Sequence, residues 1–339
     1  MAILSVVALL SFGIVAIMGK WFIPFLHKIK YGQNIIEEYG PTWHKNKQGT
    51  PTMGGIMFIV GIVLSAAAGY ITYLLTNNLL ATHSQTTTRL IIAVCMALSY
   101  GALGFLDDYI KIAKKHNMGL TSKQKFLFQL LIGIIYLALN FLLDKTYGEV
   151  STLVQIPFTN YFIDLGLFYY PLALFIIVGF VNAVNLTDGI DGLASSVTFV
   201  AALGLIVLTG ITHYFEMSIL SAALAGGTLG FLVWNFHPAK VFMGDTGSMF
   251  LGGVVVAVCF AIKQPLLLIL VGVVYLCEAF SVILQVISFK TTGKRIFKMS
   301  PIHHHFEMSG FSEQKIVFTF SAVALIGSAL AIVSALITK

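Results

Sequence analysis

Charged residues are scarce in this chain of 339 residues, in which Asp, Glu, Lys and Arg make up 10%. A soluble domain carries about 25% charged residues, because water must solvate its surface. With 58% hydrophobic residues and a mean hydropathy of +0.90, the chain is expected to present much of its surface to lipid. Lipid offers the backbone no hydrogen-bond partners, which restricts a spanning chain to helix bundles or closed barrels. The apolar runs are long and do not alternate, so they predict a helical bundle.

Cysteine is also scarce. The three cysteines, Cys95, Cys259 and Cys277, lie inside apolar runs without a partner at metal-ligand spacing. We expect them to act as small hydrophobic residues, which excludes a disulfide framework and a zinc site. The first ten residues, MAILSVVALL, lack a basic segment ahead of the apolar run. They therefore predict a first spanning helix and not a cleaved signal peptide.

Ten apolar runs approach the roughly 20 residues that a helix needs to cross a bilayer. They predict an all-α fold, a polytopic transmembrane bundle of about ten helices that forms a single integral membrane domain over residues 1–339. No internal repeat is evident, which gives no support to a transporter built from inverted repeats. The expected helices cover residues 3–25, 53–75, 90–107, 126–143, 171–187, 193–211, 217–235, 246–262, 266–288 and 315–338.

Basic residues are divided unevenly between the two sets of loops. All but four of the 20 Lys and Arg residues lie on the side of the loops that follow the first, third, fifth, seventh and ninth expected helices. The exceptions are Arg89, Lys145, Lys263 and Lys339. Because cytoplasmic loops carry the excess of Lys and Arg, both termini are expected outside the cytoplasm. The basic pI of about 9.1 then reflects orientation and contact with anionic lipid, and no nucleic-acid partner is expected.

The longest loop on the outer side covers about residues 144–170. Its stretches Ser151–Phe158 and Tyr161–Leu165 are rich in β-forming residues and are separated by only two residues. They predict a small extracytoplasmic β-hairpin with a structural role.

Acidic residues gather at the expected cytoplasmic helix ends. Asp107 and Asp108 end the third expected helix in GFLDDYIKIAKK. Acids at a membrane are costly, so they mark a functional site by default. Successive helical side chains diverge by about 100°, so we expect one aspartate to act and the other to lie behind it, with a nearby cation or a shared proton. The structural alternative is a solvated helix end that Lys111 and the neighbouring lysines balance.

The segment NAVNLTDGIDGLA, residues 182–194, joins two apolar helices with almost no loop. It carries Asp188 and Asp191, each followed by a glycine that permits unusual backbone angles and close approach of a ligand. If the segment is helical, the spacing of three residues brings both aspartates to one face. The alternative is a turn without a binding role.

Asp245 lies between two glycines in VFMGDTGSMF, residues 241–250, directly before an expected helix. The N–H groups at a helix N-terminus bind phosphate, and a carboxylate there is equally a hard oxygen ligand for Mg²⁺. The structural alternative is an N-cap aspartate. Earlier in the chain, Lys47 in KNKQGTPTMGG precedes flexible glycines, a pattern that suits an anionic ligand.

Three consecutive histidines, His303, His304 and His305, lie in the last inner loop within PIHHHFE. Successive side chains diverge and zinc sites prefer wider spacing, so a shared metal is not expected. Hydrogen bonds from imidazole to diphosphate oxygens, or a general acid, fit better. Glu278 lies inside the ninth expected helix, and the sequence leaves open whether it is a buried structural acid or part of a transporter's proton path.

The segments GTPTMGG, DDYIK, NLTDGIDGLA, FMGDTGS and PIHHHFE occur in this order between residues 49 and 307. In this set the chain closely resembles the phospho-N-acetylmuramoyl-pentapeptide transferase family of bacterial cell-wall synthesis. That family is a branch of the polyprenyl-phosphate N-acetylhexosamine-1-phosphate transferases. The resemblance implies a homodimer in the bacterial cytoplasmic membrane, with outward termini, an active site on the cytoplasmic face and a ninth helix that bends beside a groove for the lipid.

The resemblance also implies a reaction in which UDP-MurNAc-pentapeptide and undecaprenyl phosphate give lipid I and UMP, with Mg²⁺ as cofactor. By the matching motifs, Asp107 and Asp108 correspond to paired catalytic aspartates and Asp245 to the Mg²⁺ ligand, while His303 and His304 are expected in catalysis. Substrate contacts are implied for Lys47, Lys111, Lys123, Asn185, Asp188, Asp191, Asn235, Phe242 and His305.

Such an enzyme joins a cytosolic nucleotide to a lipid held in the bilayer, so its site must lie at the inner interface. Catalysis is then mostly alignment and charge neutralisation of the transferring phosphoryl group. We expect direct attack by the lipid phosphate, which Asp107 orients or deprotonates; the rival is a covalent phosphate on Asp108. The alternative functions are a UDP-GlcNAc:undecaprenyl-phosphate GlcNAc-1-phosphate transferase and a secondary transporter.

Overall fold

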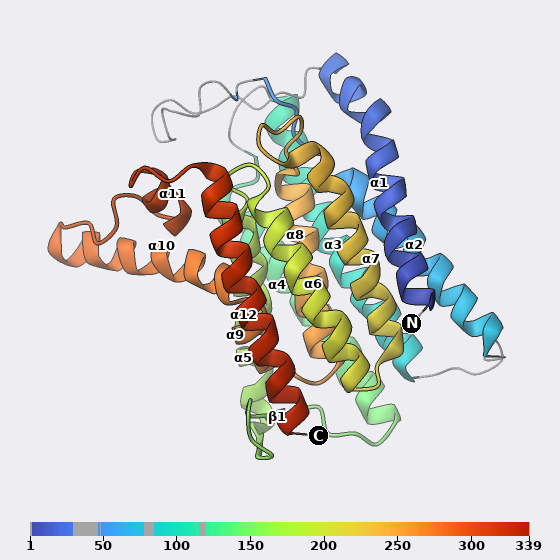
Figure 1. Cartoon of the computed structure of the whole chain (residues 1–339). Coiled ribbons are helices and arrows are strands. Elements are labelled where there is room, and N and C mark those ends of the chain that lie inside the picture. The colour runs from blue at the N-terminus through green and yellow to red at the C-terminus, as the bar shows by residue number, and fades with distance from the viewer. Residues whose placement is uncertain (1, 30–46, 48, 78–84, 115–118, 339) are drawn as a thin grey trace.

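The computed structural model describes residues 2–29, 47, 49–77, 85–114 and 119–338 (Figure 1). Lys339, counted above among the outer basic residues, lies outside them. Ten helices in the described part are long and apolar enough to cross a membrane, which confirms the predicted polytopic bundle. They are α1 (Ala2–Lys28), α2 (Gly55–Thr76), α3 (Gln85–Ala113), α4 (Ser122–Thr146), α5 (Tyr169–Thr187), α6 (Leu193–Ile211), α7 (Phe215–Asn235), α8 (Gly244–Ala261), α10 (Val273–Thr292) and α12 (Glu313–Ile337).

The centre of the bundle is α8, which is buried along almost its whole length. Packing between membrane helices depends on small residues that let two backbones approach closely. A Cβ at Gly253 would lie 3.0 Å from the Ala97 Cα, and one at Gly104 would lie 2.1 Å from the Asp245 carbonyl oxygen. Because of these close contacts, α3 packs tightly against α8, and the start of α8 lies beside the end of α3.

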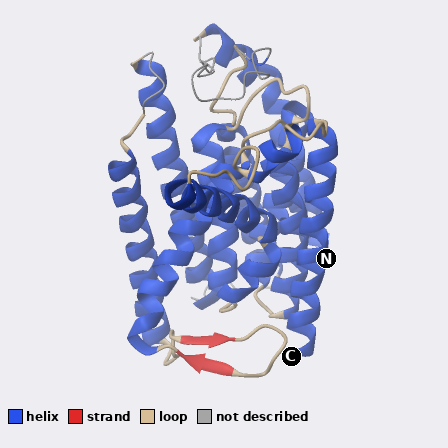
Figure 2. Cartoon of the chain, turned by 90° about the vertical axis from the view of Figure 1, so that its left-hand side faces the viewer, coloured by secondary structure: helices blue, strands red, loops and turns tan. Residues whose placement is uncertain are grey.

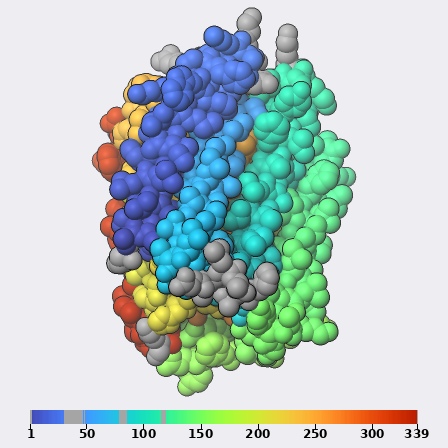
Figure 3. Space-filling view, turned by 90° about the vertical axis from the view of Figure 1, so that its right-hand side faces the viewer, coloured from blue at the N-terminus to red at the C-terminus, as the bar shows by residue number. Residues whose placement is uncertain are grey.

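The helices α1 and α4 lie at the periphery and expose most of their surface. Figure 3 shows the face on which α1 leans along α2, with α3 and α4 beside them. Large apolar side chains such as Leu9, Trp21 and Leu127 are exposed on α1 and α4. Such a surface is expected where lipid, and not water, surrounds a helix.

The helix predicted over residues 266–288 is interrupted in the structure. Residues Pro265–Leu267 form a 3₁₀ turn, η3, and Leu268–Val271 form the short helix α9 before Gly272 ends it. From Gly272 the chain turns into α10, which projects from the side of the bundle at a steep angle to the other long helices, as Figures 1 and 2 both show. A Cβ at Gly272 would lie 2.0 Å from Cζ of Phe180, so close packing on α5 accompanies the turn. Hydropathy is continuous through this segment and predicts a single helix over residues 266–288, whereas the structure divides it at Gly272, in line with the bent ninth helix that the family resemblance implies.

The predicted hairpin is confirmed but is shorter than expected. The strands β1 (Leu153–Gln155) and β2 (Phe162–Asp164) pair antiparallel, with Val154 opposite Ile163. Pro157 has no N–H to donate and Phe158 has a φ of +64°, so the pairing ends after Gln155. A 3₁₀ turn, η2 (Gly166–Phe168), then leads into α5. Figure 2 shows the hairpin at the same end of the bundle as the C-terminus.

At the hairpin end, a buried ion network joins α3, α4 and the segment after α8. Arg89, which is 2% exposed, pairs with Asp144 and lies 2.8 Å from Glu149. Lys263 pairs with Glu149 and lies 3.6 Å from Asp144. Buried charges are tolerated when they are paired in this way.

At the opposite end, α3 continues six residues beyond its predicted end at Asp107. The added turns carry Lys111, which lies four residues after Asp107 and three after Asp108 on the helix. The PIHHHFE segment, expected as a loop, forms the short helix α11 (Ile302–Glu307).

Candidate active site

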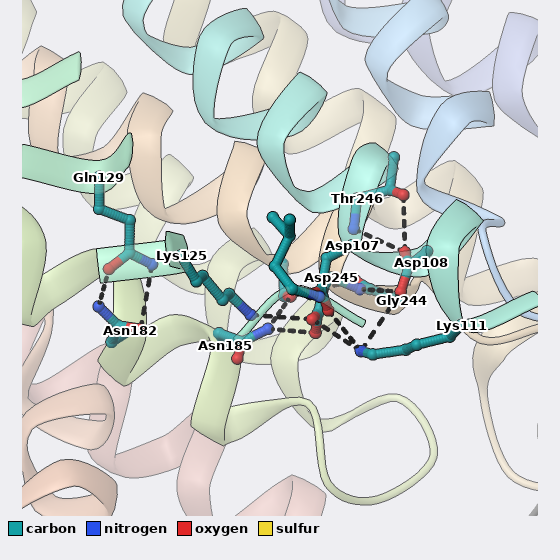
Figure 4. Close-up of polar contacts among 12 residues, drawn as sticks. Asp107, Asp108, Lys111, Lys125, Gln129, Asn182, Asn185, Gly244, Asp245 and Thr246 are labelled. Atoms are coloured by element: carbon teal, nitrogen blue, oxygen red, sulfur yellow. Dashed lines mark hydrogen bonds and ion pairs between the residues drawn. The ribbon is translucent and has the colours of Figure 1, made fainter. Parts of the chain in front are cut away.

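Three carboxylates from two helices meet where the end of α3 lies beside the start of α8, and Figure 4 shows their polar contacts. Asp107 and Asp108 come from α3, and Asp245 lies in the first turn of α8. One oxygen of each lies within 4.8 Å of the others, and we call the three residues the carboxylate cluster. Both neighbouring aspartates thus contribute an oxygen to the cluster.

The two aspartates of α3 nevertheless have different partners. The Oδ2 atom of Asp108 accepts hydrogen bonds from the backbone N–H of Thr246 at 2.9 Å and from its hydroxyl at 2.7 Å. The Oδ1 atom accepts from the backbone N–H of Asp245 at 3.3 Å. Asp108 therefore caps the N-terminus of α8, whose own N-cap residue supplies no side-chain hydrogen bond.

This cap answers two of the sequence alternatives for the start of α8. The N–H groups of Asp245 and Thr246, which we considered as phosphate donors, are already bonded to Asp108. Asp245 is also not the N-cap residue of its helix. Gly244 makes the contact possible, because it has a φ of +69° and a Cβ there would lie 2.5 Å from Oδ2 of Asp108.

Two lysines neutralise part of the negative charge. The Lys111 Nζ lies 2.6 Å from Oδ2 of Asp107 and 3.0 Å from Oδ2 of Asp245, and so bridges the two helices. The Lys125 Nζ, from the first turn of α4, lies 2.9 Å from the same oxygen of Asp245. Three carboxylates thus face two ammonium groups.

The remaining oxygens of the cluster are also hydrogen-bonded. Oδ1 of Asp107 accepts from the backbone N–H of Leu120 at 2.7 Å, just before α4. Oδ1 of Asp245 accepts from Asn185 Nδ2 at 2.8 Å, near the end of α5. One helical turn away from Lys125 and Asn185, the side-chain amides of Gln129 and Asn182 exchange two hydrogen bonds of 3.2 and 2.8 Å. This amide pair joins α4 to α5 and positions the groups that hold Asp245 (Figure 4).

Residues 188–192, which we call the DGIDG loop, form a turn between α5 and α6. The segment is not helical, so the condition under which both aspartates would share one face is not met, and the two side chains have different neighbours. Asp188 lies toward the carboxylate cluster: burial, with the nearby charges of Asp245 and Asp108, raises the pKa of Asp188 to about 8. Within the described residues no hydrogen bond engages its carboxyl group, which leaves it available to a ligand.

Asp191 belongs to a second cluster, which we call the Lys47 cluster: Lys47, Asp191, His237 and Glu313. The Lys47 Nζ lies 2.8 Å from Oδ1 of Asp191 and 2.7 Å from Oε2 of Glu313. The Oδ2 atom of Asp191 lies 3.1 Å from Nδ1 of His237. Glu313 also accepts from the backbone N–H of Asp191 at 3.0 Å, which ties the start of α12 to the DGIDG loop.

The three consecutive histidines point in different directions, as their spacing predicts. His303 is fully buried, and its Nδ1 lies 3.0 Å from Oε2 of Glu278 in α10. His304 Nδ1 lies 2.5 Å from Oε2 of Glu307. His305 accepts a hydrogen bond from the backbone N–H of Lys298 at 3.2 Å. Among the described residues, the three histidines are not part of any group of three or more side chains close enough to share a metal ion.

Three further predicted residues lie outside the carboxylate cluster. Asn235 is 2% exposed, accepts from Ser195 and donates to the Val241 carbonyl, so its side chain braces the segment before α8. Phe242 joins that segment to residues 51–54, through its N–H to Pro51 and its carbonyl to Gly54. Lys123 is exposed at the start of α4 and contacts none of the three carboxylates.

The sequence reasoning missed Lys125, His237 and Glu313. Lys125 lies two residues after Lys123, about 200° around the helix, so only one of the two lysines can face the cluster. A signal was available in the capping box of Thr121 and Gln124, which fixes where α4 begins and hence which lysine points inward. No local pattern marks His237 or Glu313, because their partners are far away in the sequence.

The donor set of the carboxylate cluster fits a hard divalent cation. Mg²⁺ takes oxygen ligands and commonly uses one or two carboxylates together with phosphate oxygens. Asp107 and Asp245 each have an oxygen within 3.0 Å of the Lys111 ammonium group. The Oδ2 atom of Asp108, in contrast, is hydrogen-bonded to Thr246 at the start of α8. The side chains of Asp191, His237 and Glu313 are equally close to one another, and in both groups lysines pair with the carboxylates. The carboxylate cluster differs in that all of its ligand atoms are carboxylate oxygens, which suit Mg²⁺ better than a group that includes an imidazole.

Comparison with known proteins finds relatives over almost the whole chain. The family model described as Glycosyl transferase family 4 matches residues 90–263. The signature described as Phospho-N-acetylmuramoyl-pentapeptide-transferase signature 1 matches residues 47–59. The first of these matches covers every residue of the carboxylate cluster, and the second includes Lys47.

Curated relatives with the name phospho-N-acetylmuramoyl-pentapeptide-transferase are similar at nearly full length. The protein from Halalkalibacterium halodurans is 47% identical over 97% of this chain and 97% of its own length. The protein from Bacillus subtilis is 46% identical over 96% of this chain and 95% of its own length. The protein from Clostridium perfringens is 47% identical over 94% and 92%, respectively.

Proposed function

Because this chain belongs to the phospho-N-acetylmuramoyl-pentapeptide-transferase family, we propose that the carboxylate cluster is the centre at which it makes lipid I. The chain is a membrane-bound transferase of peptidoglycan biosynthesis that moves phospho-MurNAc-pentapeptide from a nucleotide sugar to a polyprenyl phosphate. The observation that carries the assignment is the convergence of three carboxylates and two lysines from α3, α4 and α8. The donor is UDP-MurNAc-pentapeptide, the acceptor is undecaprenyl phosphate, and UMP is released.

In this proposal, Asp107 orients or deprotonates the lipid phosphate, which attacks the sugar-linked phosphorus directly. Asp108 is poorly suited to form a covalent phosphate, because both its oxygens accept hydrogen bonds from the start of α8. Its role is to hold Asp245 at the correct distance from Asp107. The geometry therefore favours one step over the covalent two-step route.

The positive groups of the site compensate the charge of the phosphates. Lys111 bridges Asp107 and Asp245 and Lys125 contacts Asp245, so both ammonium groups are close to any phosphoryl oxygen that approaches these carboxylates. Asp107 and Asp245 would hold Mg²⁺, which neutralises phosphoryl oxygens when it is bound. Further substrate contacts are assigned to Lys47, Asn185, Asp188, Asp191, Asn235, Phe242 and His305, with His303 and His304 in catalysis. The exposed Lys123 is left out of this set, because Lys125 takes the position beside Asp245.

The nucleotide has a natural position between the carboxylate cluster and the Lys47 cluster. The DGIDG loop connects the two, since Asp188 lies toward the first and Asp191 belongs to the second. We assign the diphosphate to the carboxylate side and the uridine to the side of Lys47 and Phe242. Asn235 supports the uridine side by bracing the Val241 carbonyl.

We further propose that residues 1–339 form one membrane domain and that the chain acts as a homodimer. The carboxylate cluster lies at the cytoplasmic face, and both termini lie outside the cytoplasm, in agreement with the excess of Lys and Arg around the cluster. Single cysteines placed at Lys145 and Lys298 test this orientation. An impermeant maleimide added to intact cells should label the first and not the second.

The decisive experiment measures UMP release by the purified protein in detergent with Mg²⁺, UDP-MurNAc-pentapeptide and undecaprenyl phosphate. We expect release to require all three components and to be lost in the Asp245→Ala variant, which keeps Asp107 and Asp108. UDP-GlcNAc, supplied in place of the donor, should give no release. If one UMP per enzyme molecule were released when the lipid acceptor is left out, the result would contradict direct attack and favour the covalent route.

A further inference from the structure

Glu278 is a carboxylate without an evident role at a completely buried position of α10. The inward side of this helix is polar, since Ser281 and Gln285 are buried along with Glu278. Gln285 accepts hydrogen bonds from the backbone N–H groups of Ile296 and Phe297, so α10 holds the segment that leads to the histidines. The inward side of α10 therefore faces α11, and not the lipid.

The partner of Glu278 is His303. Its Oε2 atom lies 3.0 Å from Nδ1 of the imidazole and 3.4 Å from the backbone N–H of the same residue. Both side chains are fully buried. A buried carboxylate is costly unless it is paired and hydrogen-bonded, so the pair fixes the ring orientation of His303.

The opposite edge of the His303 ring, which carries Nε2, packs on the DGIDG loop. A Cβ at Gly189 would lie 2.1 Å from Nε2 of His303, so only glycine leaves room for the imidazole here. The His304 ring lies beside it, with the ring centroids 4.1 Å apart. Gly189 directly follows Asp188, the aspartate that lies toward the carboxylate cluster.

One nitrogen of the ring is left over. Nε2 of His303 is buried and has no hydrogen-bond partner among the described residues. Buried polar groups nearly always have a partner, so an exception next to a substrate-binding loop calls for a reason. A carboxylate that holds one imidazole nitrogen determines which nitrogen stays free, as in other carboxylate–histidine pairs.

We propose that Glu278 is a positioning residue for the transfer reaction: through Nδ1 it holds the His303 imidazole against Gly189, so that Nε2 stays directed at the DGIDG loop. This inference rests on the proposed role of His303 in the reaction. Glu278 does not touch the substrate and acts only through His303. The carboxylate on α10 thereby connects the helix that projects from the side of the bundle to the loop that carries Asp188 and Asp191.

The test compares UMP release by full-length variants in the assay above. Glu278→Leu removes the acceptor and should lower kcat about 10- to 100-fold with little change in the KM for UDP-MurNAc-pentapeptide. Glu278→Gln keeps the size of the side chain and one acceptor oxygen, and should restore a large part of kcat. Ser281→Ala is the matched control, because it truncates a buried polar side chain of α10 that does not contact His303, and it should stay within about twofold of the parent.

A double-mutant cycle separates a positioning role from a structural one. If Glu278 acts through His303, then Glu278→Leu with His303→Ala should be no slower than His303→Ala alone, because residues that act as a unit are not additive. Multiplied losses in the double variant would overturn the proposal. So would parental activity of Glu278→Leu beside an impaired His303→Ala. If Glu278→Leu does not fold, the isosteric Glu278→Gln variant is the test. A decrease in its kcat equal to that of His303→Ala would overturn the role given to the hydrogen bond.

Failure of the proposed function gives a different result. In that case the parent chain itself releases no UMP, or His303→Ala leaves release unchanged. Neither result can be mistaken for a specific failure of Glu278, which requires an active parent and a sensitive His303.

Discussion

Replacement of Lys125 by alanine should slow the transfer strongly, whereas replacement of Lys123 should not. In the structure, the Lys125 Nζ lies 2.9 Å from Oδ2 of Asp245, and Lys123 is exposed without a contact to the cluster. A hydrogen bond to a charged group contributes about 1.5–3 kcal/mol, and each 1.36 kcal/mol changes a rate tenfold. Since Lys111 stays on the same oxygen at 3.0 Å, only one of the two ammonium contacts is lost. The expected decrease in kcat for Lys125→Ala is therefore about 10- to 150-fold.

The assay is UMP release at saturating concentrations of both substrates, with thermal unfolding of each purified variant measured beside it. Lys123→Ala is the matched control, because it removes the same side chain from the same turn of α4. The reasoning is refuted if Lys125→Ala stays within threefold of the parent, or if Lys123→Ala is the slower variant. An equal loss in the two variants would mean that the lysines act through general charge and not through the contact with Asp245.

Four more results are expected. Removal of divalent cations with EDTA should abolish UMP release and added Mg²⁺ should restore it; release that persists after chelation would exclude the metal role of the cluster. Gly244→Ala should lower both the melting temperature and kcat, because the left-handed φ costs about 1–2 kcal/mol and the new Cβ would lie 2.5 Å from Asp108. Arg89→Leu should destabilise the fold by about 1.5–3 kcal/mol in an unfolding titration, because the buried Asp144 loses its nearest partner and keeps only Lys263 at 3.6 Å, while the exposed Lys145→Ala should have little effect. Glu313→Gln should raise the KM for the nucleotide sugar about tenfold with a smaller change in kcat; an unchanged KM would count against a uridine site beside the Lys47 cluster.

The membrane bundle could be predicted because lipid imposes a simple rule on composition. Helices must be apolar over about 20 residues, and this is visible in any window of the sequence. The turn at Gly272 could not be predicted in the same way, because the residues on both sides are equally apolar. What matters there is the contact with Phe180, a residue of another helix.

The candidate site was predicted in part. Asp107, Asp108 and Asp245 stood out because carboxylates are rare in this chain, and the structure brings them together. Asp188 and Asp191 were predicted as site residues from their sequence pattern, but their separation into two neighbourhoods depends on a turn that periodicity does not describe.

Other partners could be found only in three dimensions. Lys125 became distinguishable from Lys123 only through the start of α4, and Glu313 only through its distant partners. The structural role of Asp108 is of the same kind, because the N–H groups that it caps follow 137 and 138 residues later in the chain.

This cap has a consequence for the biogenesis of the protein. Membrane helices are generally inserted first and packed afterwards, and α3 enters the bilayer long before α8 has been synthesised. Until α8 is present, Asp107 and Asp108 have no contact with Asp245 and Thr246, which form the first turn of that helix. The newly made chain is therefore expected to be inactive during translation. It should gain activity only in the assembly step in which α8 packs against α3.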